Sequence, residues 1–305
     1  MSNHCKKEKA VVLGITGNLA FAAANVLIGI KKYSPDIDAD FVVFYQNLSE
    51  NDKELLNSII PCKFVKYSFS ENKELEDAIR RYSQLSFCRY EMFKMLDEYK
   101  KLLWLDSDIL VQKDISGIFD YAKTGISLLP EKTALDECFY EGIQLENIDM
   151  AARNHNSGVL LISDILPEYK NITGWLYNRT FELADKLKFP DQGILNLMVQ
   201  ELNLQIDRLP EKYNCHPTLK TAKDAVIVHS YAPQKFWKWW DFDYHFREWD
   251  KNYKQWLKMG GSPYTGESHD IIDRWAKRIH HDCPHPLRRP AKFLKFILTK
   301  EKTNV

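Results

Sequence analysis

The chain has 305 residues, 45% hydrophobic and 28% charged, which is the balance of a soluble globular protein able to bury a large core. Its 42 basic residues equal its 42 acidic ones, so the net charge of zero provides no global field that would attract nucleic acid. No run of about twenty apolar residues is present, so no membrane-spanning helix is expected.

Strands and helices alternate in the first half of the sequence. The pattern predicts strands at residues 10–15, 41–45, 64–67 and 101–105, and helices at residues 19–32, 49–60 and 87–98. Ser49 or Asn51 would cap the second helix. This alternation predicts an α/β fold with a mainly parallel central sheet flanked by helices.

The second half is less regular. Residues 158–162 and 225–228 read as strands, residues 192–200 as a helix, and aromatic residues crowd the segment from Ser230 to Trp256. Gly260 to Pro263 then interrupts the chain. We therefore expect one catalytic domain over residues 1–260 and a basic, aromatic tail over residues 261–305.

The cysteine pattern and the N-terminus bear on location. The six cysteines are scattered singly, without the spacing of a zinc site or a disulfide framework, which favours a reducing compartment. The first ten residues are polar and do not form a signal peptide. A cytoplasmic protein is expected.

The strongest chemical signal is Asp106-Ser107-Asp108, which directly follows the apolar residues 102–105. Carboxylates are costly inside a buried strand, but two of them where a strand ends can turn into one cavity. Their hard oxygens suit Mn²⁺ or Mg²⁺, with a diphosphate as a further ligand. The alternative is a simple turn, which the apolar flanks disfavour.

His229 ends a second apolar run, so its imidazole could complete a metal site with the two aspartates. Taken alone, it could equally be a structural hydrogen-bonding residue. Lys235 follows closely and could neutralise a phosphate, or it could be a solvated surface lysine.

Three further positions are ambiguous from the sequence. Asp191 could be a helix N-cap, Asn156 could belong to a turn before a strand, and Arg89 could form a surface ion pair. The aromatic residues 236–240 could line an acceptor groove or pack in the core.

Together, in this order, these segments resemble family 8 of the retaining glycosyltransferases, especially bacterial α-galactosyl- and α-glucosyltransferases that build lipooligosaccharide. The resemblance covers residues 10–240 and rests on several motifs at suitable spacing. They are Arg89, residues 103–108, residues 156–162, residues 191–196 and residues 229–237.

The resemblance implies a GT-A fold, a UDP-sugar donor, a glycan or glycolipid acceptor and bound Mn²⁺, with Mg²⁺ as the alternative ion. It assigns Asp106, Asp108 and His229 to the metal. The implied donor-binding residues are Thr16, Asn18, Arg89, Asp106, Ser107, Asn156 and Lys235. Gln192 and Asp191 would be the catalytic residues, with Gln192 near the anomeric carbon.

The sequence departs from the family pattern at several places. Thr16 stands near the position of an acidic residue that contacts uracil in many relatives, and Gly193 replaces a second aspartate after Gln192. The strand at residues 127–130 lacks an aspartate that some relatives use for the acceptor. These changes leave the identity of the sugar and of the acceptor open.

The tail and two rival functions complete the expectations. Residues 288–298 combine basic and apolar side chains, which suits either an anionic membrane surface at the inner face of the membrane or a helix packed on the domain. One rival is an NAD-dependent sugar epimerase or reductase, from an incomplete glycine-rich turn at residues 14–17 and the pair Tyr90 and Lys94. The other is a degenerate, non-catalytic glycan-binding member of the family.

Overall fold

The computed structural model describes residues 5–68, 84–231, 235–237 and 246–265. A seven-stranded sheet forms its centre, in the order β3-β2-β1-β4-β7-β6-β8. The strands are β1 (Lys7–Thr16), β2 (Asp40–Gln46), β3 (Lys63–Lys66), β4 (Tyr99–Leu105), β6 (Ile126–Ala134), β7 (Arg153–Ser163) and β8 (Asp207–Arg208). Neighbouring strands pair in parallel except that β7 runs antiparallel to both β4 and β6, so the mainly parallel sheet is confirmed.

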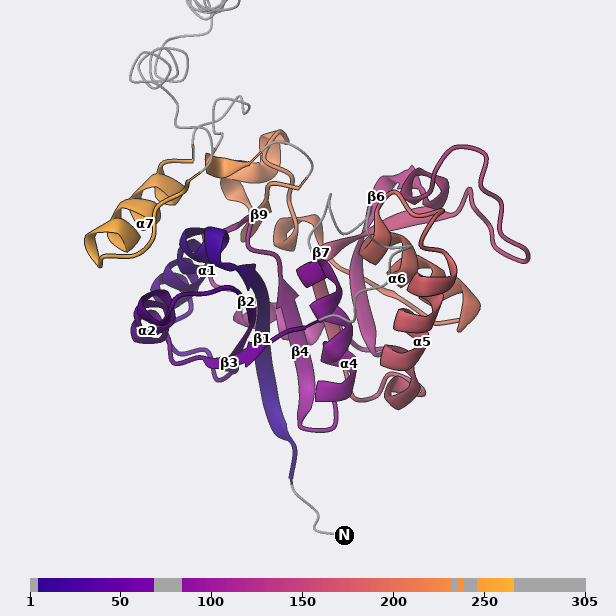
Figure 1. Ribbon diagram of the computed structural model, residues 1–305, viewed down its shortest axis with the longest axis horizontal. Helices are drawn as coiled ribbons and strands as arrows, with labels where there is room; N and C mark the ends of the chain where they lie inside the picture. Colours follow the sequence, from indigo (N-terminus) through magenta and orange to yellow (C-terminus); the bar gives the residue numbers. More distant parts are fainter. Residues whose placement is uncertain (1–4, 69–83, 232–234, 238–245, 266–305) are drawn as a thin grey trace, which may run out of the picture.

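Helices cover both faces of this sheet (Figure 1). On one side lie α1 (Ala20–Tyr33), α2 (Glu50–Ile59) and α7 (Arg247–Lys258), and on the other α4 (Met92–Met95), α5 (Tyr169–Glu182) and α6 (Pro190–Glu201). Alternate residues of β1 divide between the two cores: Val11 and Leu13 face the first, Ala10 and Val12 the second. In the described ranges every helix is too short or too polar to cross a bilayer.

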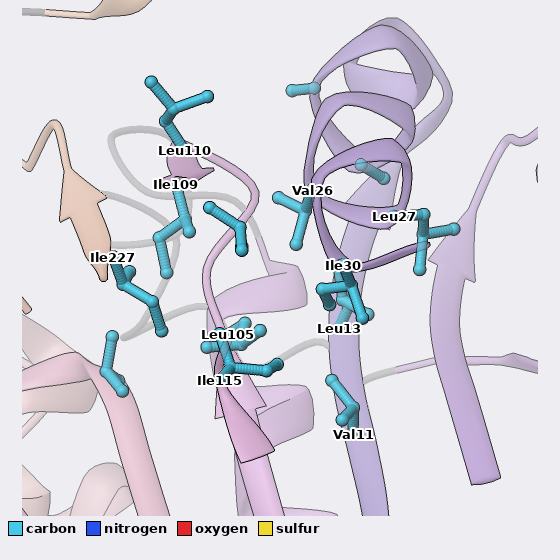
Figure 2. Close-up of a cluster of buried hydrophobic side chains, with 14 of the residues drawn as sticks. Val11, Leu13, Val26, Leu27, Ile30, Leu105, Ile109, Leu110, Ile115 and Ile227 are labelled. Atoms are coloured by element: carbon cyan, nitrogen blue, oxygen red, sulfur yellow. The ribbon is translucent and has the colours of Figure 1, made fainter. Parts of the chain in front are cut away.

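A second, two-stranded sheet lies beside the first core. It joins β5 (Ile109–Val111) to β9 (Ile227–His229) in antiparallel register, with Ile109 opposite His229. Figure 2 shows side chains of β1, β4, β5, β9 and α1 converging in this core. Gly29 permits the close packing of α1 on β5, since a Cβ there would lie 3.0 Å from the Cβ of Val111. This packing holds β5 where it continues from the Asp106-Ser107-Asp108 segment.

Most predicted elements are confirmed, with two corrections. The predicted helix at residues 87–98 is instead a 3₁₀ helix, η3 (Gln84–Glu91), and a single α-turn, α4, because the chain must turn back quickly to enter β4 at Tyr99. Asn156-Ser157-Gly158 does not form a turn before a strand but lies within β7, where Asn156 pairs with Leu129 of β6 and the carbonyl of Gly158 accepts from the N–H of Asp106. Ser49 is the N-cap of α2 and accepts from the backbone N–H of Asp52.

The last described segment belongs to the first core. The helix α7 packs on α1 through two buried asparagines: Asn25 donates to the carbonyl of Trp249 at 2.8 Å, and Asn252 donates to Oδ1 of Asn25 at 3.1 Å. Beyond α7, Ser262 donates to the carboxylate of Asp52. The expected division of the chain after residue 260 stays a prediction, and residues 266–305 lie outside the described part.

Replacing Asn252 tests this attachment. Asn252→Ala removes a buried donor from the carbonyl and side-chain oxygens of Asn25, so we expect the free energy of unfolding to fall by about 1–3 kcal/mol. Urea unfolding monitored by tryptophan fluorescence measures it. The exposed Lys254→Ala on the same helix serves as control and should change it by less than about 0.5 kcal/mol. Equal stability of the two variants would contradict a structural role for this contact.

Candidate active site

A cavity of about 850 Å³ opens where β1 and β4 end and β7 begins. Parallel strands place their carboxyl ends at one edge of a sheet, and the antiparallel β7 adds the residues of its first half to that edge. Many of the residues in its wall are polar, among them Thr16, Arg89, Asp106, Ser107, Asp108, Glu131, Thr133, Asn154, Asn156, Ser157, Asp191, Gln192, His229 and Lys235. Of the metal-binding, donor-binding and catalytic residues expected from the sequence, only Asn18 is absent from this wall; it is exposed and bonds to the hydroxyl of Thr16.

Asp106 stands at the end of β4 with one carboxylate oxygen already occupied. Its Oδ1 accepts from Nε1 of Trp104 at 2.6 Å and from Nη2 of Arg89 at 3.0 Å. Its backbone N–H donates to the carbonyl of Gly158 at 2.9 Å, which continues the β4–β7 ladder. The carboxylate is thereby held in one orientation, with Oδ2 turned towards His229 at 3.6 Å.

His229 reaches the aspartates because β9 pairs with β5. Ile109 lies opposite His229 in the register, and the N–H of Ser230 donates to the carbonyl of Asp108 at 2.9 Å. The imidazole Nε2 then lies 3.1 Å from Oδ1 of Asp108. One ligand atom from each of Asp106, Asp108 and His229 falls within 4.8 Å of the other two, so the three predicted metal ligands are brought together.

The hydrogen bonding of His229 fits a bound cation. Its Nδ1 lies 2.9 Å from Oδ1 of Asn214, an acceptor, so Nδ1 carries the proton of the neutral ring. Nε2 then presents a lone pair; it is buried and makes no hydrogen bond in the described residues. A lone pair facing two carboxylates is repulsive unless a proton or a metal cation lies between them. Two carboxylates and one imidazole suit Mn²⁺ or Mg²⁺.

Gly158 leaves the space that this centre needs. A Cβ at residue 158 would lie 2.0 Å from Cε1 of His229 and 2.7 Å from Oδ2 of Asp106. These are atoms of a buried ring and of a hydrogen-bonded carboxylate, which cannot move aside cheaply. Any side chain at this position would therefore displace two of the three candidate ligands.

Lys235 forms an ion pair with Oδ2 of Asp108 and donates to the carbonyl of Ser230 at 3.0 Å. It is therefore no free surface lysine. Burial raises the pKa of the Asp108 carboxyl, but His229 in its protonated form and Lys235 outweigh this and hold the pKa below its ordinary value. The lysine lines the cavity next to the metal triad, where it can meet an anionic group.

Arg89 is buried between two aspartates and is not a surface ion pair. Its guanidinium contacts Asp106 at 3.0 Å and Asp191 at 3.1 Å, and donates to the carbonyl of Ser157 at 2.8 Å. Burial raises the pKa of Asp191, an effect that Arg89 opposes and Asp106 reinforces. Asp191 does not cap α6, whose N-cap is Phe189; its carboxylate turns to Arg89 and Ser157 instead.

Glu131 is a cavity residue that the sequence analysis missed. Lying on β6, it accepts hydrogen bonds from Asn154 at 3.2 Å, Asn156 at 2.8 Å and Gln192 at 3.3 Å. The predicted strand at residues 127–130 lacked an aspartate, but β6 extends to Ala134 and carries a glutamate just beyond that range. Glu131 reaches the cavity because β6 is longer than the strand predicted from composition.

The aromatic residues after His229 divide between the two predicted roles. Trp237 and Tyr231 line the cavity, whereas Phe236 is buried in the first core against Phe246 and Trp249. Residues 238–240 lie outside the described part.

Tyr90 and Lys94, the two residues on which the epimerase hypothesis rests, do not lie at the cavity. Tyr90 is buried with its hydroxyl 3.2 Å from Oγ1 of Thr180, and Lys94 pairs with Glu91 at 3.0 Å. Neither residue lines the cavity.

Comparison with known proteins finds similarity to glycosyltransferases. The family described as Glycosyl transferase family 8 matches residues 10–241. A probable glycosyl transferase Gly of Streptococcus gordonii is 30% identical over 160 residues, 50% of this chain and 21% of that protein. A lipopolysaccharide 1,2-glucosyltransferase of Escherichia coli is 27% identical over 236 residues, 67% of this chain and 62% of that protein. The chain thus spans less than two thirds of the length of either relative.

Solved structures share the fold. The crystal structure of the galactosyltransferase LgtC with donor and acceptor sugar analogs superposes with a TM-score of 0.60 at 17% identity, covering 87% of this chain and 99% of that one. The glycosyltransferase GlyE of Streptococcus pneumoniae gives a TM-score of 0.53 at 17% identity, covering 90% and 73%. At these identities the likeness establishes the GT-A fold.

Gly158→Ala tests whether the triad holds a metal. The new methyl group would push the His229 ring away from the aspartates, so we expect Mn²⁺ affinity to fall at least about 10-fold, as measured by isothermal titration calorimetry. Gly174→Ala is the matched control, since a Cβ there meets nothing within 4 Å and should slightly stabilise α5. Undiminished Mn²⁺ binding by Gly158→Ala would exclude this centre.

Proposed function

The chain belongs to glycosyltransferase family 8, and on this basis we propose that it transfers a hexose, galactose or glucose, from a UDP-sugar to a glycan acceptor with retention of configuration. The observation that carries the proposal is the bare Nε2 of His229, buried between Asp106 and Asp108 on the wall of a cavity large enough for a sugar nucleotide. The lipopolysaccharide glucosyltransferase among the relatives favours a role in cell-surface glycan synthesis.

Asp106, Asp108 and His229 would hold Mn²⁺ or Mg²⁺, which when bound offsets the charge of the departing diphosphate. Lys235 lies beside them and would pair with a phosphate oxygen in place of Asp108. Thr16 and Ser107 line the same cavity and would contact the nucleoside, as would Asn18 once its bond to Thr16 is rearranged.

The transferred sugar would lie beyond the triad, among Arg89, Asn156, Asp191 and Gln192. Arg89 is already neutralised by two aspartates, and amides, carboxylates and the Ser157 hydroxyl lie nearby. Such a wall recognises hydroxyl groups by hydrogen bonding, and among the described residues it offers no spare cation to an acidic sugar. This supports a neutral hexose as the donor sugar.

Retention requires either a covalent intermediate or attack on the face that the leaving group departs from. Asp191 is engaged by Arg89 and Ser157, and the amide oxygen of Gln192 has little basicity, so neither is a suitable nucleophile. We therefore favour front-face attack, in which the leaving phosphate oxygen accepts the proton of the acceptor hydroxyl. A glycosyl adduct found on Asp191, Gln192 or Glu131 by mass spectrometry would refute this.

Asp108→Ala provides the direct test of function. In assays with Mn²⁺ and a panel of UDP-sugars, the protein should release UDP, and the variant should do so at least about 100-fold more slowly because one of three ligands is lost. Asp120→Ala, an exposed aspartate, is the control and should leave the rate unchanged. If the wild-type protein releases no UDP from any donor, the degenerate, non-catalytic alternative is favoured. Reduction of NAD would favour the epimerase.

We propose that residues 266–305, outside the described part, attach the enzyme to anionic lipid at the inner membrane face through the basic and apolar residues 288–298. In flotation with liposomes containing anionic lipid, the full chain should float and a chain lacking residues 270–305 should not. Equal flotation of both would reject this role.

A further inference from the structure

A continuous series of hydrogen bonds joins Glu131 to His229 through two buried asparagines. Asn156 donates from Nδ2 to Oε1 of Glu131 at 2.8 Å, and Asn214 donates from Nδ2 to Oδ1 of Asn156 at 2.9 Å. Oδ1 of Asn214 then faces Nδ1 of His229 at 2.9 Å. Both asparagines are almost fully buried, at 3% and 0% exposure, so water cannot replace a lost partner.

Two neighbours of Asn156 determine which groups donate and which accept along this series, because one of them can only accept a hydrogen bond and the other can only donate one. A carboxylate such as Glu131 accepts, and the backbone N–H of Gly158, which lies 3.0 Å from Oδ1 of Asn156, donates. Turning the amide of Asn156 by half a rotation would oppose its oxygen to the carboxylate and its NH₂ group to the N–H. Each such mismatch costs about 1–3 kcal/mol, so the amide has one orientation.

The orientation of the Asn156 amide determines that of the Asn214 amide, which in turn determines the tautomer of the imidazole. Because Oδ1 of Asn156 can only accept, Asn214 must present its NH₂ group there and its oxygen to His229. The neutral ring must then carry its proton on Nδ1 and its lone pair on Nε2. Nε2 is the atom that faces Asp106 and Asp108.

We propose that Glu131, Asn156 and Asn214 form a positioning relay that fixes the tautomer of His229 as a metal ligand before any ion arrives. The proposal rests on the proposed function in so far as His229 is taken to bind the metal. Metal-binding histidines are commonly oriented by a hydrogen bond at the second nitrogen, and such partners govern affinity without touching the ion.

The relay also reaches the sugar end of the cavity. The second oxygen of Glu131 accepts from Nε2 of Gln192 at 3.3 Å, which leaves Oε1 of Gln192 facing the backbone N–H of Ser157 at 3.3 Å. The Glu131 carboxylate therefore orients two groups. One is the amide of Gln192, which is proposed to lie near the anomeric carbon, and the other is the series of hydrogen bonds that ends at the metal ligand His229. Glu131 is a positioning residue for both ends of the site.

The tautomer can be read directly by ¹⁵N NMR of histidine-labelled protein without metal, at a pH of about 9, where imidazole is neutral. The signals of His229 are assigned by their loss in His229→Asn. We expect the neutral ring of the wild-type protein to be protonated at Nδ1, and Asn214→Leu to lose this preference. Protonation of the wild-type ring at Nε2 would overturn the relay.

Metal affinity gives a second readout, measured by titration calorimetry with Mn²⁺ alone. Asn214→Leu should bind Mn²⁺ about 10- to 100-fold more weakly than wild type, because the ring is no longer held with Nε2 bare. Asn214→Asp keeps an acceptor for Nδ1 and should retain the tautomer, although its second oxygen opposes Oδ1 of Asn156 and lowers stability. The exposed Asn178→Leu on α5 controls for the substitution itself.

Unchanged Mn²⁺ affinity in a folded Asn214→Leu, or loss of the tautomer in Asn214→Asp, would each refute the relay. The second criterion applies even if Asn214→Leu fails to fold. Neither readout uses a sugar donor, so failure of glycosyl transfer leaves this test intact. Conversely, if the wild-type protein binds no Mn²⁺, the proposed metal centre is refuted. The NMR measurement of the His229 tautomer then still tests the relay.

Discussion

Four buried or half-buried carboxylates line one cavity, and the need to offset their charge governs the structure around it. The guanidinium of Arg89 lies between Asp106 and Asp191, and the carboxylate of Glu131 is surrounded by amide donors. Asp108 is paired with a lysine. Burial without such partners would cost several kcal/mol for each ion. What stays uncompensated is the side of Asp106 and Asp108 that faces an imidazole lone pair, and this is where a divalent cation fits.

The fold assembles these groups by combining two strand arrangements. The parallel part of the sheet brings the ends of β1 and β4 together, as in other open α/β sheets. Insertion of the antiparallel β7 places Gly158 directly beside Asp106. The small sheet of β5 and β9 then carries His229 to Asp108. Each of these contacts depends on backbone pairing between strands.

Much of the fold could be predicted because local patterns report burial. The apolar run before Asp106 and the alternation of strands and helices indicated both the sheet and the edge at which polar residues gather. The prediction was wrong where tertiary contacts override local preference. Residues 87–98 have helical periodicity, yet residues 87–91 belong to a 3₁₀ helix whose Arg89 points into the cavity. Residues 156–158 resemble a turn, yet they lie in β7, where Asn156 pairs with Leu129 and the carbonyl of Gly158 accepts from Asp106.

The sequence by itself determined the family resemblance, the α/β fold and the candidate ligands of a metal, because residue types and their order along the chain carry that information. Only the tertiary structure decided that Glu131 belongs to the cavity and that Asn214 faces His229. These two residues come from separate segments with no motif, and their role lies in the direction of hydrogen bonds. That direction depends on which donors and acceptors are buried together, which no linear spacing records.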